Sequence, residues 1–140
     1  MGQAADIVRR WVELYNDGTP EEYGSDRFLE LYAPNANWVE MPSPMHPSGR
    51  TGDAETIREL LKQNSHLFRN RRVELNEVIE EGNIAAWTAI WSATVAEDNP
   101  EDGIPIKAGS RIQIRLAVIT EVVDGLIVRQ HEYISNPEAV

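Results

Sequence analysis

The sequence of 140 residues contains no cysteine, so disulfide bonds and thiolate metal sites are excluded. It also lacks any apolar run close to the roughly 20 residues that a helix needs to cross a bilayer, so we expect no membrane partner. The first six residues have neither the basic start nor the apolar stretch of a secretory signal. We therefore expect a cytoplasmic protein.

Positive charge is scarce: 13 lysines and arginines stand against 23 acidic residues, which gives a net charge of −10. A surface of this sign repels phosphate backbones, so we expect no nucleic-acid partner. A short basic cluster at 69–72 follows a predicted helix, where cations close to the last carbonyl groups have a structural role.

The length is typical of one domain, and we expect residues 1–140 to form a single one. Three segments carry helix signals. Apolar residues recur at helical spacing over 6–16, a capping box with proline at 19–22 opens a second helix that runs to Tyr32, and a third helix starts near Asp53 and ends around Phe68.

The second half of the chain alternates with a period of two instead. This pattern predicts one early strand and then four successive strands, at 36–41, 73–80, 84–95, 110–123 and 126–135. Helices that precede a meander favour an α+β fold, in which helices cover one face of a curved antiparallel sheet. Such a sheet would wrap around the first helix and close an apolar pocket.

The strand at 110–123 shows which face is inside. Its apolar face holds six residues, namely Ile112, Ile114, Leu116, Val118, Thr120 and Val122. A three-residue hairpin loop at 123–125 would pair Val122 with Leu126. Continuing that register turns Leu126, Val128, Gln130, Glu132 and Ile134 inward.

Gln130 and Glu132 are then polar residues on an apolar face, with Val118 and Leu116 as their expected cross-strand neighbours. A buried carboxylate without a cation has a raised pKa or gathers hydrogen-bond donors, and either state suits a general acid or base. Two alternatives place Glu132 in solvent: an open sheet end, or a two-residue turn that shifts the register. We favour the inward reading because the shifted register would bury Arg115.

Two tryptophans on the preceding strand, Trp87 and Trp91, share a face with several alanines. Large rings beside small residues leave room for a flat ligand, although tryptophans also simply fill a core. We keep both interpretations open.

Three segments, 11–18, 31–38 and 124–128, resemble the nuclear transport factor 2-like superfamily, and within it the SnoaL-like polyketide cyclases and ketosteroid isomerases. The resemblance implies a cone-shaped, antiparallel or mixed sheet wrapped around a long N-terminal helix with two further helices, a cystatin-like α+β barrel. It also implies a pocket for a small apolar organic ligand, and a homodimer through the outer sheet face, where we expect Ile119, Ile127 and Tyr133.

The same resemblance bears on catalysis. The catalytic aspartate of ketosteroid isomerases corresponds to Met41, their oxyanion-binding tyrosine to Trp11 and their second aspartate to Val118, so steroid isomerisation is not expected. Tyr32 resembles their supporting tyrosine. The last-strand acid of SnoaL-like cyclases corresponds to Glu132, which we take as the catalytic residue.

We expect ten residues to line the pocket: Trp11, Tyr15, Tyr32, Met41, Trp87, Trp91, Leu116, Val118, Gln130 and Ile134. His46, in the proline-rich loop at 42–49, either reaches over the pocket mouth or is simply solvated. Glu40 is not expected to converge with any histidine, and we expect neither a metal nor a cofactor.

Two functions fit these features. The first is an enzyme of the cyclase, isomerase, dehydratase or hydrolase type, in which Glu132 moves a proton on an apolar or polycyclic substrate. The second is a module of the same fold that binds a ligand or mediates dimerisation without catalysis.

Overall fold

The computed structural model describes residues 3–17, 26–64, 66–98 and 106–140. Their helices are α1 (Gln3–Tyr15), the short 3-10 helix η1 (Arg27–Leu31) and α2 (Ala54–Asn64). The strands are β1 (Tyr32–Glu40), β2 (Arg50–Gly52), β3 (Phe68–Glu81), β4 (Ile84–Val95), β5 (Arg111–Val123), β6 (Leu126–Ile134) and β7 (Glu138–Ala139). None of the described helices is long and apolar enough to cross a membrane.

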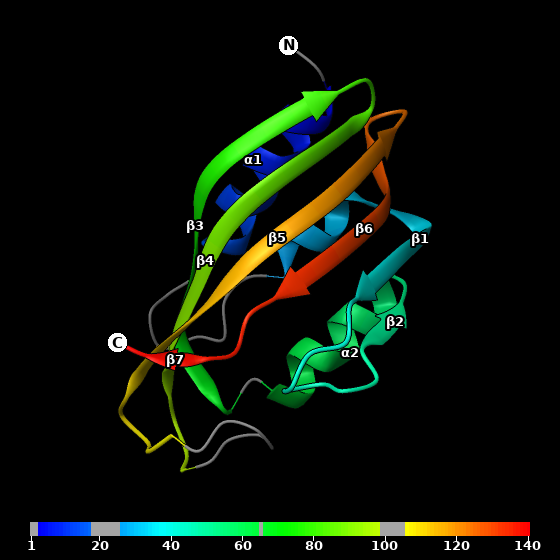
Figure 1. Cartoon of the computed structure of the whole chain (residues 1–140). Coiled ribbons are helices and arrows are strands. Elements are labelled where there is room, and N and C mark those ends of the chain that lie inside the picture. The colour runs from blue at the N-terminus through cyan, green and yellow to red at the C-terminus, as the bar shows by residue number, and fades with distance from the viewer. Residues whose placement is uncertain (1–2, 18–25, 65, 99–105) are drawn as a thin grey trace.

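The strands form one mixed sheet in the order β2-β1-β6-β5-β4-β3, with β7 added beside β5. Only β1 and β6 run parallel; the other pairs are antiparallel. The long strands β3, β4 and β5 bend along their length, and α1 lies behind them while α2 lies beside β1 and β2 (Figure 1). The expected α+β class with a curved sheet around the first helix is confirmed, although the sheet does not close into a barrel.

Irregularities in β3 accompany the bend. The pairing of β3 with β4 shifts register between Arg69 and Arg72 and again between Leu75 and Glu77, and Asn70 has a positive φ of 51°. Extra residues of this kind increase the local twist and bend a strand. The bend leaves a concave side of the sheet, on which α1 packs (Figure 1).

The amphipathic face of α1 packs on the concave side against β3, β4 and β5. Asn16 directly follows the last residue of this helix, and its side chain links the helix to β3. The amide nitrogen of Asn16 donates to the Val73 carbonyl and its oxygen accepts from the Val73 N–H, both at 2.8 Å. The core below α1 is formed by buried side chains that include Val8, Trp11, Trp87, Val118, Val122 and Ile127.

The second and third helices differ most from the sequence prediction, which also did not include the short strands β2 and β7. The expected second helix is reduced, among described residues, to η1, and Tyr32 opens β1 instead of ending a helix; the capping box at 19–22 lies outside the described residues. The third helix ends at Asn64, and Phe68 begins β3, because its ring packs with Trp91 in a separate apolar cluster.

The hairpin between β5 and β6 corrects the expected register. Asp124 and Gly125 both have positive φ, 53° and 79°, and form a two-residue turn that pairs Val123 with Leu126. A bulge follows, since Glu121 pairs with Arg129 while Val122 pairs with Ile127, which leaves Val128 as the extra residue. The predicted three-residue loop, the pairing of Val122 with Leu126 and the inward side chain of Leu126 were therefore wrong. The expected cross-strand neighbours were wrong as well, because Gln130 pairs with Thr120 and Glu132 pairs with Val118.

Candidate active site

A cavity of about 180 Å³ lies between the concave side of the sheet and the helices α1, η1 and α2. Most of its wall is apolar or aromatic, including Trp11, Phe28, Ile57, Leu60, Trp91, Ile114 and Leu116. Its charged and titratable members are Tyr15, Tyr32, Glu40, His46, Arg50, Arg71 and Glu132. A mostly apolar hollow with a few polar groups is typical of a small-molecule site.

Glu132 lies on the wall of this cavity, near the end of β6. Burial raises the pKa of its carboxyl from an ordinary 4.5 to about 7. A hydrogen bond from the Gln130 amide lowers the pKa, the nearby charge of Glu40 raises it, and the Trp38 side chain and Arg50 lower it. At neutral pH this carboxyl therefore exchanges a proton readily, as a general acid or base requires.

A chain of buried hydrogen bonds holds that carboxyl in place. The Trp87 indole N–H donates to Thr120 Oγ1 at 3.0 Å, and the Thr120 hydroxyl donates to Gln130 Oε1 at 3.1 Å. This leaves the Gln130 amide nitrogen to donate to Glu132 Oε2, at 2.9 Å. Thr120 and Gln130 are each 1% exposed, so water does not compete for these hydrogen bonds and the network is rigid. Because the indole N–H can only donate, it fixes which group donates and which accepts at each later hydrogen bond.

A second carboxylate, Glu40, lies beside Glu132 because the two residues are register partners on β1 and β6. Glu40 is 4% exposed and binds the Arg50 guanidinium with both oxygens, at 3.2 Å to Nε and 2.6 Å to Nη2. His46 Nδ1 lies 2.9 Å from Glu40 Oε1. The Arg50 guanidinium also stands over the Trp38 ring, 5.7 Å from its centroid.

Two tyrosine hydroxyls complete the polar part of the wall. The Trp11 indole donates to the Tyr32 hydroxyl at 3.0 Å, and the Trp91 indole donates to the Tyr15 hydroxyl at 2.8 Å. Burial raises the pKa of both hydroxyls above the ordinary value, and Glu132 adds to the increase in each case. Both therefore stay protonated at neutral pH and can donate a hydrogen bond.

Comparison with known proteins places the chain in a family. Residues 8–130 match the model of the SnoaL-like domain. The chain belongs to the SnoaL-like family. No curated protein matches it in sequence.

Solved structures share the fold of this SnoaL-like domain at low sequence identity. IdmH of Streptomyces antibioticus, a candidate polyketide cyclase, is 22% identical over 95% of this chain and 92% of its own, with a TM-score of 0.71. A protein of Catenulispora acidiphila with a ketosteroid isomerase-like fold, solved in complex with trimethylamine, is 17% identical over 93% of this chain and 85% of its own, with a TM-score of 0.66. A candidate polyketide cyclase of Xanthomonas campestris is 17% identical over 94% and 89%, with a TM-score of 0.67.

Eight of the residues singled out in the sequence lie on the cavity wall of the SnoaL-like domain: Trp11, Tyr15, Tyr32, His46, Trp91, Leu116, Glu132 and Ile134. The structure places four others elsewhere. Trp87, Val118 and Gln130 are buried in the core beside the cavity, and Gln130 acts on the site through its hydrogen bond to Glu132. Met41 follows β1, whose alternation turns Trp38 and Glu40 inward, so its side chain lies outside the wall.

Sequence reasoning missed the charged cluster. Glu40 was not expected to converge with a histidine, but it lies against His46, because the loop at 41–49 folds back on the end of β1. Ala36, Trp38 and Glu40 occupy alternate positions on the buried side of β1, and this period of two was a signal for the inward direction of Glu40. Among the described residues no group of three His, Asp or Glu side chains could hold a metal ion, and the absence of a metal and a cofactor stays a prediction.

Proposed function

We propose that this SnoaL-like domain is an enzyme of the cyclase or isomerase type that transfers a proton on a small, mainly apolar carbonyl compound, with Glu132 as the proton carrier. The observation that carries the proposal is the Glu132 carboxyl on a mostly apolar cavity wall, where burial raises its pKa to about 7. General acid–base catalysis by a group of this kind contributes about 10²- to 10⁴-fold to a rate.

The cavity volume supports a compact substrate. An apolar protein cavity of about 150 Å³ takes up benzene, so 180 Å³ suits one ring with substituents, or two small fused rings. A ligand of this size is smaller than the polycyclic substrate that the sequence suggested. The walls contribute affinity by burying that ring, and the few polar groups orient it.

The polar groups match the needs of a carbonyl substrate. In its ionised form Glu132 would take a proton from the carbon next to the carbonyl. The charge that then develops on the carbonyl oxygen would be stabilised by a hydrogen bond from Tyr15 or Tyr32, both of which stay protonated. Trp11 and Trp91 hold these hydroxyls in position.

The test follows exchange of the hydrogens next to the carbonyl of 2-cyclohexenone, 2-indanone and 2-tetralone into D2O by proton NMR. We expect the protein to accelerate exchange for at least one ketone, and Glu132→Gln to lower that rate by about 100-fold or more. Quenching of cavity tryptophan fluorescence by the same ketone should persist in Glu132→Gln, because the substitution keeps the cavity shape. Glu121→Gln, which removes a carboxyl from outside the cavity wall, is the matched control and should keep the wild-type rate.

The same experiment decides the alternative of a binding module without catalysis, which is favoured by the apolar residues Met41 and Val118 at positions where the related isomerases carry acids. Ketone binding without any exchange would select that module. Exchange at the wild-type rate in Glu132→Gln, or no binding of any of the three ketones, would contradict the proposal.

A further inference from the structure

We propose that Thr120, a residue behind the cavity wall, is a positioning residue of this site. Its hydroxyl sets the direction of the Gln130 amide, and that direction prepares Glu132 to accept a proton from the substrate. The inference rests on the proposed function, in which Glu132 is the proton carrier, and names a further residue on which that role depends. It is carried by the three hydrogen bonds that join the Trp87 indole to the Glu132 carboxyl.

Thr120 is a polar exception in the core. Among the described residues, the buried side chains that are polar or charged are those of Glu40, Thr120 and Gln130. A buried hydroxyl costs free energy unless it is hydrogen-bonded, and valine would fill the same strand position without that cost. Packing alone therefore does not account for a hydroxyl at position 120, whereas its hydrogen bond to Gln130 does.

The bulge at Val128 brings these two polar side chains together. In a hairpin with the two-residue turn alone, Gln130 would pair with Ile119 and point to the outer face of the sheet. The extra residue moves Gln130 opposite Thr120, so both side chains lie on the inner face. Glu132, two residues further along β6, shares that face with Gln130.

The hydrogen bonds around the Gln130 amide agree on one direction for it. Its Oε1 accepts from the Thr120 hydroxyl at 3.1 Å, and its Nε2 donates to Glu132 Oε2 at 2.9 Å. The Trp87 indole donates to Thr120 Oγ1, so the Thr120 hydroxyl hydrogen points away from the indole. A hydrogen bond from Gln130 also lowers the pKa of the Tyr32 hydroxyl, which places a second acceptor on the Nε2 side. A turned amide would set its carbonyl oxygen against both of these oxygens.

The direction of the amide decides which form of Glu132 is favoured. Burial raises the pKa of Glu132, and the hydrogen bond from Gln130 is the strongest of the influences that lower it. An N–H donor stabilises the carboxylate, whereas a carbonyl oxygen at the same place would accept from the protonated carboxyl and favour that form. With Nε2 in place, about half of the carboxyls are ionised at pH 7 and can take a proton from carbon.

Other ionisable groups also face the cavity that Glu132 lines. They are Tyr15 from α1, Tyr32 and Glu40 from β1, His46 from the loop after β1, Arg50 from β2 and Arg71 from β3. The residues that η1, α2, β4 and β5 contribute to the wall are apolar or aromatic. A substitution at Thr120 leaves all of these groups in place, so a change in the titration of Glu132 reports the hydrogen-bond chain.

The test follows the titration of Glu132 by carbon-13 NMR of the carboxyls in glutamate-labelled protein, with the signal assigned by its loss in Glu132→Gln. The wild-type midpoint should lie near pH 7. Thr120→Val should raise it by about one pKa unit, because the released amide can turn its oxygen toward the carboxyl. Gln130→Met removes the donor outright and should raise it at least as far. Thr120→Ser keeps the hydroxyl and should keep the wild-type midpoint, as should Thr88→Val, the matched control on the outer sheet face.

The catalytic consequence is a change in the pH dependence of ketone exchange. With the higher midpoint, Thr120→Val should exchange about tenfold more slowly than the wild type at pH 6. At pH 9 the two rates should be nearly equal, because Glu132 is then ionised in both proteins. A loss of packing alone would not produce this dependence on pH.

An unchanged or lowered midpoint in folded Thr120→Val, or a midpoint that rises equally in Thr120→Ser, would overturn this inference. Thr120→Ala removes the same hydroxyl and takes the place of Thr120→Val if that variant lacks native circular dichroism. Failure of the proposed function is recognised separately, by the absence of ketone exchange in the wild type. The NMR midpoints do not depend on turnover, so they decide the link from Thr120 to Glu132 in either case.

Discussion

The charge state of Glu132 is the residue-scale property on which the site depends, and it has a cost in stability. The unfolded chain releases this proton near pH 4.5, whereas burial raises the pKa in the folded protein to about 7. Between these two values the folded state binds the proton and the unfolded state does not. The free energy of unfolding therefore falls as the pH rises through this window.

The first prediction concerns the pH dependence of Glu132→Gln. The variant cannot titrate at this position, so its free energy of unfolding should equal that of the wild type near pH 4 and exceed it near pH 8 by up to about 3 kcal/mol, at about 1.4 kcal/mol per pKa unit. Urea unfolding monitored by circular dichroism at several pH values measures the difference.

Glu121→Gln is the control of opposite sign. A hydrogen bond from Arg129 lowers the pKa of Glu121, so this carboxyl stabilises the fold above its unfolded pKa and the contribution is lost in acid. Its replacement should lower stability slightly near pH 7 and leave it unchanged near pH 3. An equal response of both variants to pH would contradict the assignment of the raised pKa to Glu132.

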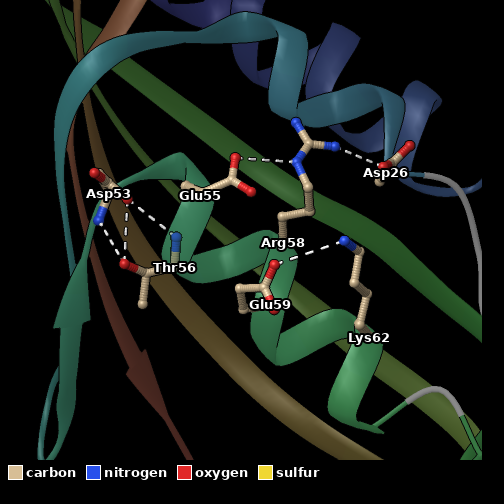
Figure 2. A network of polar contacts seen from close by, with 7 residues as sticks. All are labelled: Asp26, Asp53, Glu55, Thr56, Arg58, Glu59 and Lys62. Carbon is tan, nitrogen blue, oxygen red and sulfur yellow. Dashed lines mark hydrogen bonds and ion pairs between the residues drawn. The ribbon is translucent and has the colours of Figure 1, made fainter.

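At the scale of the element, the start of α2 is a feature that the local sequence predicted and the structure confirms. Asp53 was predicted to begin the helix, and it is the N-cap: its Oδ1 accepts from the Thr56 N–H at 3.0 Å, while the Asp53 N–H donates to Thr56 Oγ1 at 3.2 Å (Figure 2). Arg58 then links the helix to Asp26, beside η1, at 2.7 Å. These contacts hold α2 over the cavity, where Ile57, Leu60 and Leu61 form part of the wall.

The second prediction tests this cap. Asp53→Ala should lower the free energy of unfolding by about 1 kcal/mol, because it leaves the first N–H groups of the helix without an acceptor. Glu59→Gln is the matched control on the same helix: it weakens only the exposed ion pair with Lys62, at 3.6 Å, and should change stability by less than about 0.5 kcal/mol. Equal losses in urea unfolding would contradict the capping role.

The hairpin of β5 and β6 shows what sequence reasoning at this scale could not reach. Asp124-Gly125 predicts a turn at the right place, but the number of residues in the loop and the bulge at Val128 depend on pairing along the whole hairpin. The two-residue turn is present, and without a bulge it would have placed Glu132 on the outer face of the sheet. The extra residue Val128 shifts the pairing by one residue, so that Glu132 faces inward. As a result Ile127, expected on the outer face, is completely buried.

At the scale of the whole molecule, the outer sheet face retains exposed apolar side chains. Ile79 on β3 is 66% exposed and Tyr133 on β6 is 45% exposed, and both border a shallow hollow that also includes Ile119. Contiguous apolar surface on a sheet commonly lies in an interface. The homodimer through this face, now without Ile127, therefore stays a prediction.

The third prediction is that the protein in solution has about twice the mass of the 15.8 kDa chain by size-exclusion chromatography with light scattering. The double substitution Ile79→Glu/Tyr133→Glu should shift the mass to that of one chain, because charges placed opposite their own copies across a two-fold interface repel. Lys62→Glu, an exposed change on α2 away from this face, should leave the dimer intact. A dimer that survives the double substitution would contradict the location of the interface.

The sequence by itself determined the class of fold and the order of its elements, with helices mainly in the first half of the chain and strands mainly in the second. Helical spacing over α1, period-two alternation over β3 to β6 and the cap at Asp53 depend on neighbours within a few residues, so local patterns report them. The same patterns identified Glu132 as a polar residue on an apolar strand face.

Only the tertiary structure decided the partners of that residue. The parallel pairing of β1 with β6 sets Glu40 beside Glu132, and the return of the loop at Gly49 brings in His46 and Arg50. Contacts between strands distant in sequence arise from the sheet order and the bulge, which no local periodicity encodes.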